Sequence, residues 1–302
     1  MDNVMSPYGV RTELACLPCF FGQVTRTLKY AGVNGDQGRK IMREAEAIIE
    51  GASLDEVPAR TTTVIHRMLR RETGVDPYRA VKQLYNRIAL ERLPALRKRV
   101  AQTVDPLEGG VRAAIAGNVI DFGIYETVDV DRSIEESFRL PLDPLPYGLF
   151  ADRAAASQSI LYLCDNAGEI VFDRVLLDVL RGMGKDVTTV VKGEPVINDA
   201  TMDDARATGL GESAVVIDNG NDGIGTLLEA CSPRFRDAYR SADLIISKGQ
   251  ANFETLAGEG DERIFFLFKV KCPVVAGFLK RRDGDIVIMR NDECGWPIKG
   301  PR

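Results

Sequence analysis

The feature that most constrains the fold is an alternation of short apolar runs and helical stretches in the second half of the chain. Six runs rich in Val, Ile, Leu and Phe recur there, and helical stretches separate most of them. The runs are residues 160–164, 187–192, 214–218, 242–248, 264–268 and 286–289. Near-continuous apolar strands separated by helices are typical of a mostly parallel sheet that helices cover on both faces. The sequence therefore predicts an α/β fold with a Rossmann-like α/β/α sheet domain.

The first hundred residues have a different pattern, because apolar residues recur there at helical spacing. The predicted helices cover residues 14–31, 36–49, 59–72 and 76–104, with Pro94 as a kink. We therefore predict a helical N-terminal region, residues 1–104, that forms a bundle or cap, followed by an α/β domain, residues 105–302. The proline-rich segment 129–158 is predicted to be a linker or a surface excursion.

Charge and hydropathy exclude several classes of partner. The net charge of −5 and the pI near 5.2 argue against a nucleic acid or a membrane surface as the main partner, because both demand a basic face. No apolar stretch approaches the length of a bilayer span. The first residues lack the basic start and apolar core of a signal peptide, so we expect a cytoplasmic protein. The sequence gives no indication of the oligomeric state.

The cysteines and the single histidine narrow the chemistry. Cys16 and Cys19 form a CxxC motif, and the other four cysteines are scattered singly, which is not a secreted disulfide framework. The motif is open to three interpretations: buried thiols, a redox-active pair, or half of a zinc site. His66 lies in the helical half, far in sequence from the polar clusters. Catalysis is therefore expected to use carboxylates, lysines and a metal.

Polar side chains follow the first two predicted strands. Asp165 and Asn166 come directly after residues 160–164, and Asp199 follows the second strand. The carboxyl edge of an open α/β sheet is where such folds bind ligands. The same residue types are also ordinary turn and helix-capping residues, and this alternative stays open. Read as ligands, two carboxylates and an amide suit a hard divalent ion such as magnesium or manganese.

Cations and amides follow the later strands. Lys248 precedes a glycine at a helix start, with Asn252 one turn further on, and Lys269 and Lys271 follow the fifth strand. A lysine beside free backbone amides suits a phosphate. Upstream, Asn118 and Asp121 are three residues apart and share one side of a helical turn. Together these residues indicate metal-assisted phosphoryl transfer to water.

The same motifs carry a resemblance. DNAGEIVFD, VINDAT, SKGQANFETL and KVKCPVVAGF occur in that order, with AGNVIDFG upstream and CLPC near the start. The set resembles the metal-dependent damage-control phosphatase family, also called domain of unknown function eighty-nine, in its CxxC-containing archaeal and bacterial branch. The resemblance implies a helical region on an α/β catalytic domain, and hydrolysis of phosphate monoesters of small or damaged metabolites.

Roles for individual residues follow from the resemblance. Asp165, Asn166 and Asp199 match the metal ligands, and Asn118, Lys248 and Asn252 match positions near the substrate phosphate. Lys271 matches a family lysine that acts with Asp165 and Asp199 in catalysis, with Lys269 as the alternative. Glu169 is assigned to the metal's water shell and the substrate side, and Asp173 to a structural role. The implied cofactor is a divalent ion, namely manganese, magnesium, cobalt or nickel, and the implied partner is a small phosphorylated metabolite.

Three questions stay open at this point. The phosphorus is attacked either by Asp165 or Asp199, forming an aspartyl phosphate, or by water, and water attack is slightly favoured. A non-catalytic regulator that binds a metal or a nucleotide would use the same sheet edge. A redox or zinc protein would instead use Cys16 and Cys19, with the α/β part as scaffold. The physiological substrate is not indicated.

Overall fold

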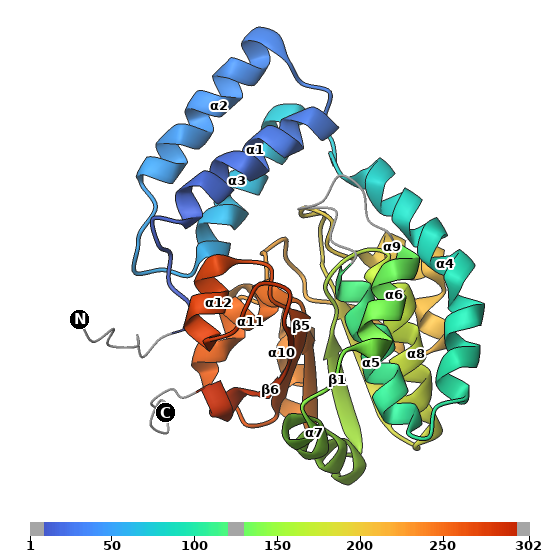
Figure 1. Ribbon diagram of the computed structural model, residues 1–302. Coiled ribbons are helices and arrows are strands. Elements are labelled where there is room, and N and C mark those ends of the chain that lie inside the picture. The colour runs from blue at the N-terminus through green and yellow to red at the C-terminus, as the bar shows by residue number, and fades with distance from the viewer. Residues whose placement is uncertain (1–8, 120–129, 295–302) are drawn as a thin grey trace.

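The computed structural model describes residues 9–119 and 130–294 and has one six-stranded sheet flanked by helices (Figure 1). The strands are β1 (Ser159–Leu163), β2 (Asp186–Val191), β3 (Val215–Asp218), β4 (Leu244–Lys248), β5 (Ile264–Lys269) and β6 (Ile286–Arg290). The helices before the sheet are α1 (Cys16–Tyr30), α2 (Gly35–Glu50), α3 (Pro58–Thr73), α4 (Arg79–Ala101), α5 (Pro106–Val119), α6 (Val130–Arg139) and α7 (Pro144–Ala156). Those between the strands are α8 (Glu169–Gly182), α9 (Met202–Thr208), α10 (Pro233–Ser241), α11 (Gln250–Leu256) and α12 (Pro273–Leu279).

The sheet confirms the predicted α/β class, and each predicted strand is present. Its order is β3-β2-β1-β4-β5-β6, in which β1 to β5 are parallel and β6 is antiparallel to β5. The chain runs outward from β1 through β2 to β3, and β4 then returns to the other side of β1. This reversal makes the ends of β1 and β4 the topological switch point, where open α/β sheets bind ligands.

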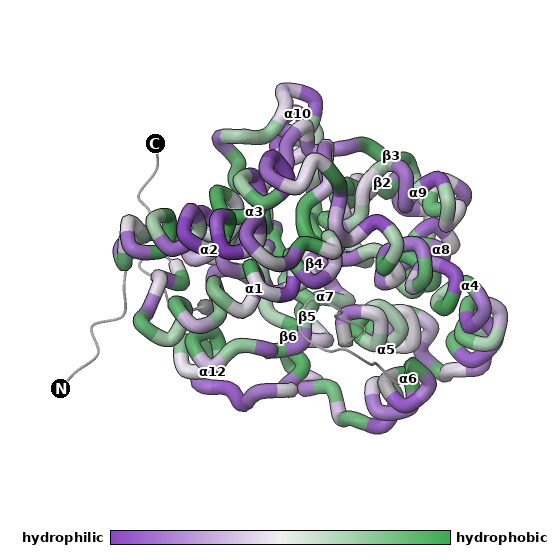
Figure 2. Tube along the Cα trace, turned by 90° about the horizontal axis from the view of Figure 1, so that it is seen from above, coloured by the Kyte–Doolittle hydropathy of each residue, from purple (hydrophilic) through white to green (hydrophobic). Residues whose placement is uncertain are grey.

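Alternation along the strands buries both faces of the sheet. Along β1, Ile160 and Tyr162 pack with α5, α7 and α8, whereas Leu161 and Leu163 face the core that contains α10 to α12. The strand side chains that form these two cores are hydrophobic and have little exposed surface, whereas Thr189 and Ser247 are polar strand residues that are also buried. In Figure 2, viewed from above, the tube of α2 is largely hydrophilic and lies at the periphery, away from the strands.

The helical N-terminal region divides between two places. Helices α1, α2 and α3 pack against one another, and their buried apolar side chains belong to the same core as those of α11 and α12. Helix α4 instead packs along α5 and α8, on the opposite side of the sheet (Figure 1). The first three helices therefore sit above the carboxyl edge of the sheet as a cap. The predicted boundary near residue 104 stays a prediction.

One expectation from the sequence was wrong. The described part of the predicted linker 129–158 forms α6 and α7; Asp143 caps α7, Pro144 begins it, and Phe150 is fully buried. Pro144 therefore marks a helix start. After β3 the chain makes a short 3₁₀ turn, Leu228–Ala230, and α10 begins after it, where the Ser232 side chain accepts a bond from Phe235 N. Among the described residues, none of the helices combines the length and the apolar character that a membrane span requires.

Candidate functional site

The turn from β1 into α8 presents the first two candidate ligands. Asp165 and Asn166 follow β1 after a single residue, Cys164, and α8 begins at Glu169. Gly168 makes this turn possible, because its φ is +77° and a Cβ there would lie 3.2 Å from Tyr85. Its backbone N–H donates to Asn86 Oδ1 of α4 at 2.7 Å. The positive φ therefore favours glycine here, and a Cβ would also crowd Tyr85.

Asp199 is brought to the same place by backbone pairing. An isolated antiparallel bridge joins Asn166 to Asp199. On either side of it, Ala200 N donates to Asp165 O at 2.8 Å, and Ala167 N donates to Asn198 O at 2.9 Å. The two segments are thus locked side by side at the carboxyl edge. We call Asp165, Asn166 and Asp199 the candidate metal site.

The carboxylate of Asp165 lies directly against the turn after β4. Gly249 has φ +82°, and a Cβ at this position would come within 2.1 Å of Asp165 Cγ. No side chain fits there, so the glycine of the SKGQ segment makes room for the Asp165 carboxylate. The sequence had linked this glycine to phosphate binding; its observed contact is with Asp165.

Asn118 connects the candidate metal site to the residues behind it. Its Nδ2 donates to Asp165 Oδ2 at 3.0 Å and to both oxygens of Glu169 at 3.1 Å. Its Oδ1 accepts a bond from Lys269 N at 2.9 Å. Asn166 Nδ2 also donates to Asp165, at 2.8 Å, which leaves the Asn166 Oδ1 oxygen outside these bonds. Two amides therefore fix the orientation of one carboxylate.

Behind Asn118 lies a fully buried group of Glu169, Asp173 and Lys248, which we call the closed cluster. Lys248 Nζ donates to Glu169 Oε1 at 2.6 Å, to Asp173 Oδ1 at 2.7 Å and to Ala114 O at 3.0 Å. All three charged side chains are 0% exposed. Burial raises the pKa of Asp173 to about 6, and Lys248 limits the rise. Burial would lower the pKa of Lys248, but Asp173 and Glu169 raise it above its usual value.

Two predicted phosphate contacts do not fit this geometry. The three N–H donors of Lys248 are all engaged inside the protein, so it has none left for a phosphate. Asn252 is also buried, donates to Cys164 O and Lys248 O, and accepts from Thr226 Oγ1. Both residues brace the turn after β4 from beneath. The sequence placed them at the correct edge but could not show which way their side chains point.

The remaining predicted residues differ in their exposure. Lys269 and Lys271 are partly exposed at the end of β5, and Lys271 N donates to Gln250 Oε1 at 3.0 Å. Glu169 accepts bonds from Asn118 and Asn166 and has no exposed surface, so it acts behind the candidate ligands. Asp173 has the structural position expected of it. Asp121 lies outside the described residues.

One residue at the site was not assigned from the sequence. Lys192, at the end of β2, is buried, and its Nζ lies 3.5 Å from Asp199 Oδ2. It donates to Gly223 O at 2.8 Å and also to Gly225 O. Its position in the sequence could have identified it, because Lys192 stands at the carboxyl end of a parallel strand as Lys248 does.

The CxxC motif lies at the start of α1. Cys16 is buried and its pKa is raised, chiefly by that burial, whereas Cys19 is exposed. Five cysteines are free thiols, namely Cys16, Cys19, Cys164, Cys231 and Cys272. Within residues 9–119 and 130–294, no group of three or more His, Cys, Asp or Glu side chains is arranged to hold a metal ion. The candidate metal site is not such a group, because it consists of two carboxylates and one amide.

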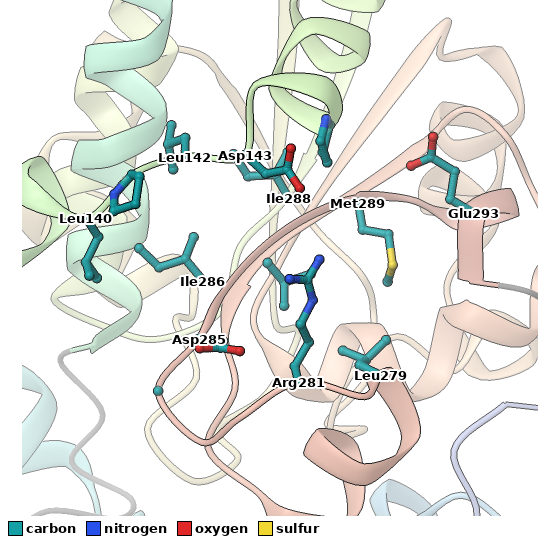
Figure 3. A pocket seen from close by; sticks show the side chains of 14 residues that line it. Leu140, Leu142, Asp143, Leu279, Arg281, Asp285, Ile286, Ile288, Met289 and Glu293 are labelled. Atoms are coloured by element: carbon teal, nitrogen blue, oxygen red, sulfur yellow. The ribbon is translucent and has the colours of Figure 1, made fainter.

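A groove of about 490 Å³ runs along edge strand β6 (Figure 3). The segment before α7 and the segment after α12 form its walls, with Leu140, Leu142, Leu279 and Arg281 among the side chains that line it. None of the candidate metal ligands lines this groove. The chemistry proposed below therefore rests on the carboxyl edge and not on this groove.

The fold and the site define a class: an α/β protein whose switch point carries two carboxylates and an amide above a buried ion cluster. The family model of the damage-control phosphatase ARMT1-like domain matches residues 12–287. The chain therefore belongs to the damage-control phosphatase family, as the resemblance of its motifs predicted. This membership supports a phosphatase role.

Relatives agree with this placement along nearly the whole chain. A damage-control phosphatase of Pyrococcus horikoshii is 32% identical, covering 93% of this chain and 99% of its own. One of Archaeoglobus fulgidus is 34% identical, covering 90% of this chain and 96% of its own. An uncharacterised protein of Methanocaldococcus jannaschii is 38% identical, covering 93% of this chain and 96% of its own. The crystal structure of a DUF89 family protein from P. horikoshii superposes with a TM-score of 0.83 at 34% identity, covering 93% of this chain and 99% of that one.

Proposed function

We propose that the protein is a divalent-metal-dependent phosphatase that hydrolyses phosphate monoesters of small metabolites, including damaged ones. The observation that carries the proposal is the convergence of Asp165, Asn166 and Asp199 at the switch point, where backbone pairing holds two separate segments together. Carboxylate and amide oxygens are the ligands that magnesium and manganese prefer, and cobalt and nickel are further candidates.

The charged groups around the site suit a bound cation. The carboxylates of Asp165 and Asp199 lie at the same edge of the sheet as those of Glu169 and Asp173. Lys248 pairs with Glu169 and Asp173, and Lys192 Nζ lies 3.5 Å from Asp199 Oδ2. Carboxylates gathered in a largely buried environment are costly unless counter-ions accompany them. In this proposal a divalent cation held by Asp165, Asn166 and Asp199 adds positive charge at this edge.

In this proposal the chain's own residues bind and orient. Asn118 and Asn166 hold the Asp165 carboxylate, while the closed cluster keeps Glu169 fixed behind them. Lys271 and Lys269, partly exposed at the same edge, neutralise phosphoryl oxygens that face away from the acidic side. The bound metal supplies Lewis-acid polarisation of the phosphoryl group and stabilises charge in the transition state.

Water is the favoured nucleophile. Asp165 and Asp199 both serve as ligands in this arrangement, and Asp165 is further tied by two amide donors. A carboxylate held in this way has little freedom to attack phosphorus. The aspartyl-phosphate route remains the alternative, and trapping a phosphorylated protein with labelled substrate distinguishes the two.

The proposed substrate is a small phosphorylated metabolite in the cytoplasm. The acidic chain, with net charge −5, does not favour a nucleic acid. The test is hydrolysis of p-nitrophenyl phosphate by metal-stripped protein, with and without added manganese, magnesium, cobalt or nickel. Activity restored by metal and absent from Asp165→Asn supports the proposal. A wild-type protein that binds manganese yet turns over neither this ester nor a panel of phosphometabolites would instead support a regulator.

A further inference from the structure

Helix α3 of the cap reaches down to the loops that follow β2 and β3. Thr63 Oγ1 accepts a bond from Ile224 N at 3.0 Å. Arg67 Nε donates to Asp222 Oδ1 at 2.8 Å, and an amino group of Arg70 donates to Asp222 Oδ2 at 2.6 Å. The two arginines thus share one carboxylate, which is largely buried. The cap is therefore joined by ion pairs to loops at the carboxyl edge.

Arg70 makes further contacts that Arg67 does not. It donates to the backbone oxygen of Pro195 and, at 3.0 Å, to Glu194 Oε2. Both acceptors lie in the loop after β2, a few residues before Asp199. Val196 of the same loop packs in a small apolar cluster with Ala59 of α3 and Ile224. One helix therefore grips the segment that delivers the third candidate ligand.

The backbone of this segment is in an unusual conformation. Ile197 has φ +43°, a region that β-branched residues rarely adopt. Asp199 N donates to Val196 O at 3.1 Å and closes the turn around it. Such a conformation persists only where surrounding contacts impose it. The contacts of α3 with Pro195, Val196 and Ile197 supply that constraint.

A second connection reaches Asp199 from the other side. Lys192, which lies 3.5 Å from the Asp199 carboxylate, donates to the carbonyl oxygens of Gly223 and Gly225. These glycines flank Ile224, whose N–H is bound by Thr63 of α3. The same helix thus fixes the backbone on one flank of Asp199 and the ammonium group on the other.

We propose that Arg70 is a positioning residue of the candidate metal site and that it acts by fixing the loop that carries Asp199. The inference rests on the proposed function, because it takes Asp199 as a ligand. Removing Arg70 is then expected to loosen the loop that carries Asp199, one of the three proposed ligands, while the remainder of the fold stays intact. In this way helix α3 of the cap helps to hold the candidate metal site in place.

The matched variants are Arg70→Gln and Arg67→Gln. Each removes one of the two arginine partners of Asp222, but only Arg70→Gln also removes the contacts with Pro195 and Glu194. Calorimetric titration of the metal-stripped full chain with MnCl₂ is expected to show about tenfold weaker binding for Arg70→Gln, as for other supports of metal ligands. Arg67→Gln is expected to change the affinity less than about threefold. Arg70→Lys should recover part of the loss, because one ammonium replaces one of several donors.

Hydrogen exchange of the metal-free variants supplies an independent readout. Peptides spanning residues 193–199 should exchange faster in Arg70→Gln than in Arg67→Gln, with similar melting temperatures for both. Equal manganese affinity in folded Arg70→Gln and wild type overturns the inference, as does equal weakening in both variants. If wild type binds no manganese, the metal-dependent function fails first and the inference falls with it. If wild type binds it and Asp165→Asn does not, failure of Arg70→Gln to weaken binding counts against the inference alone.

Discussion

Two groups of charged residues lie next to each other at the carboxyl edge and differ in how they are satisfied. In the closed cluster, Lys248 uses all three donors on Glu169, Asp173 and Ala114, and its charged side chains have no exposed surface. In the candidate metal site, the amide groups of Asn118 and Asn166 donate to Asp165, and Lys192 Nζ lies 3.5 Å from Asp199 Oδ2. The closed cluster is sealed inside the protein and supports structure. We propose that the oxygens of the candidate metal site are arranged to hold a cation.

The largest expected effect is on stability, from breaking the closed cluster. Lys248→Met removes the ammonium group that binds both Glu169 and Asp173 and leaves two buried carboxylates without it. We expect the free energy of unfolding to fall by about 3–5 kcal/mol, measured by urea denaturation. Lys98→Met on the exposed side of α4 is the control, with an expected change within about 0.5 kcal/mol. A stable Lys248→Met protein would show that the closed cluster is not structural.

The next effect is on activity, from altering the candidate metal site. Asp165→Asn keeps the shape of the side chain and removes its charge. We expect the metal-dependent kcat/KM for p-nitrophenyl phosphate to fall about a hundredfold or more, with the melting temperature little changed. Asp283→Asn, in an exposed loop, is the control. If Asp165→Asn lowered the free energy of unfolding as much as Lys248→Met does, the candidate metal site would be as structural as the closed cluster, and the comparison would be wrong.

A third prediction concerns pH and the closed cluster. The pKa of Asp173 is raised from its ordinary value of 3.8 to about 6, chiefly by burial. Between those values the folded state holds a proton that the unfolded state has released. Stability is therefore expected to decrease as pH rises from about 4 to about 6, by at most about 3 kcal/mol. Denaturation of wild type and Asp173→Asn across this window measures the slope, which should be smaller in the variant. The prediction is wrong if the free energy of unfolding of wild type, relative to that of Asp173→Asn, increases with pH across this window.

The smallest expected effect is on the residue shared by the two groups. Asn118→Ala removes the amide between Asp165 and Glu169. We expect about tenfold weaker manganese binding by calorimetry, the usual cost of losing a residue that orients a ligand. Asn291→Ala, another buried amide that binds Leu256 O, should lower stability without this change in affinity. Equal manganese affinity in Asn118→Ala and wild type would mean that the two groups are independent.

The sequence anticipated the sheet because the signals for its strands are local. Each strand is a short apolar run, and a parallel strand ends where polar residues begin, so Asp165, Asn166 and Asp199 were assigned to one edge. The prolines of the segment before β1 did not identify its structure. Pro141, Pro144 and Pro146 together suggested a linker, but Pro144 is the first residue of helix α7. A proline-rich segment forms a packed helix when its apolar side chains, here Phe150, are buried against the rest of the protein.

By itself, the sequence determined the α/β class, the edge where polar residues gather and the family, since periodicity and motif order are properties of neighbouring residues. Only the tertiary structure decided that Lys248 turns inward and Lys192 lies beside Asp199, because the direction of a side chain depends on partners far away in the chain. It also decided that Arg70, more than a hundred residues before Asp199, grips its loop. Long-range packing selects these partners, and no local pattern encodes them.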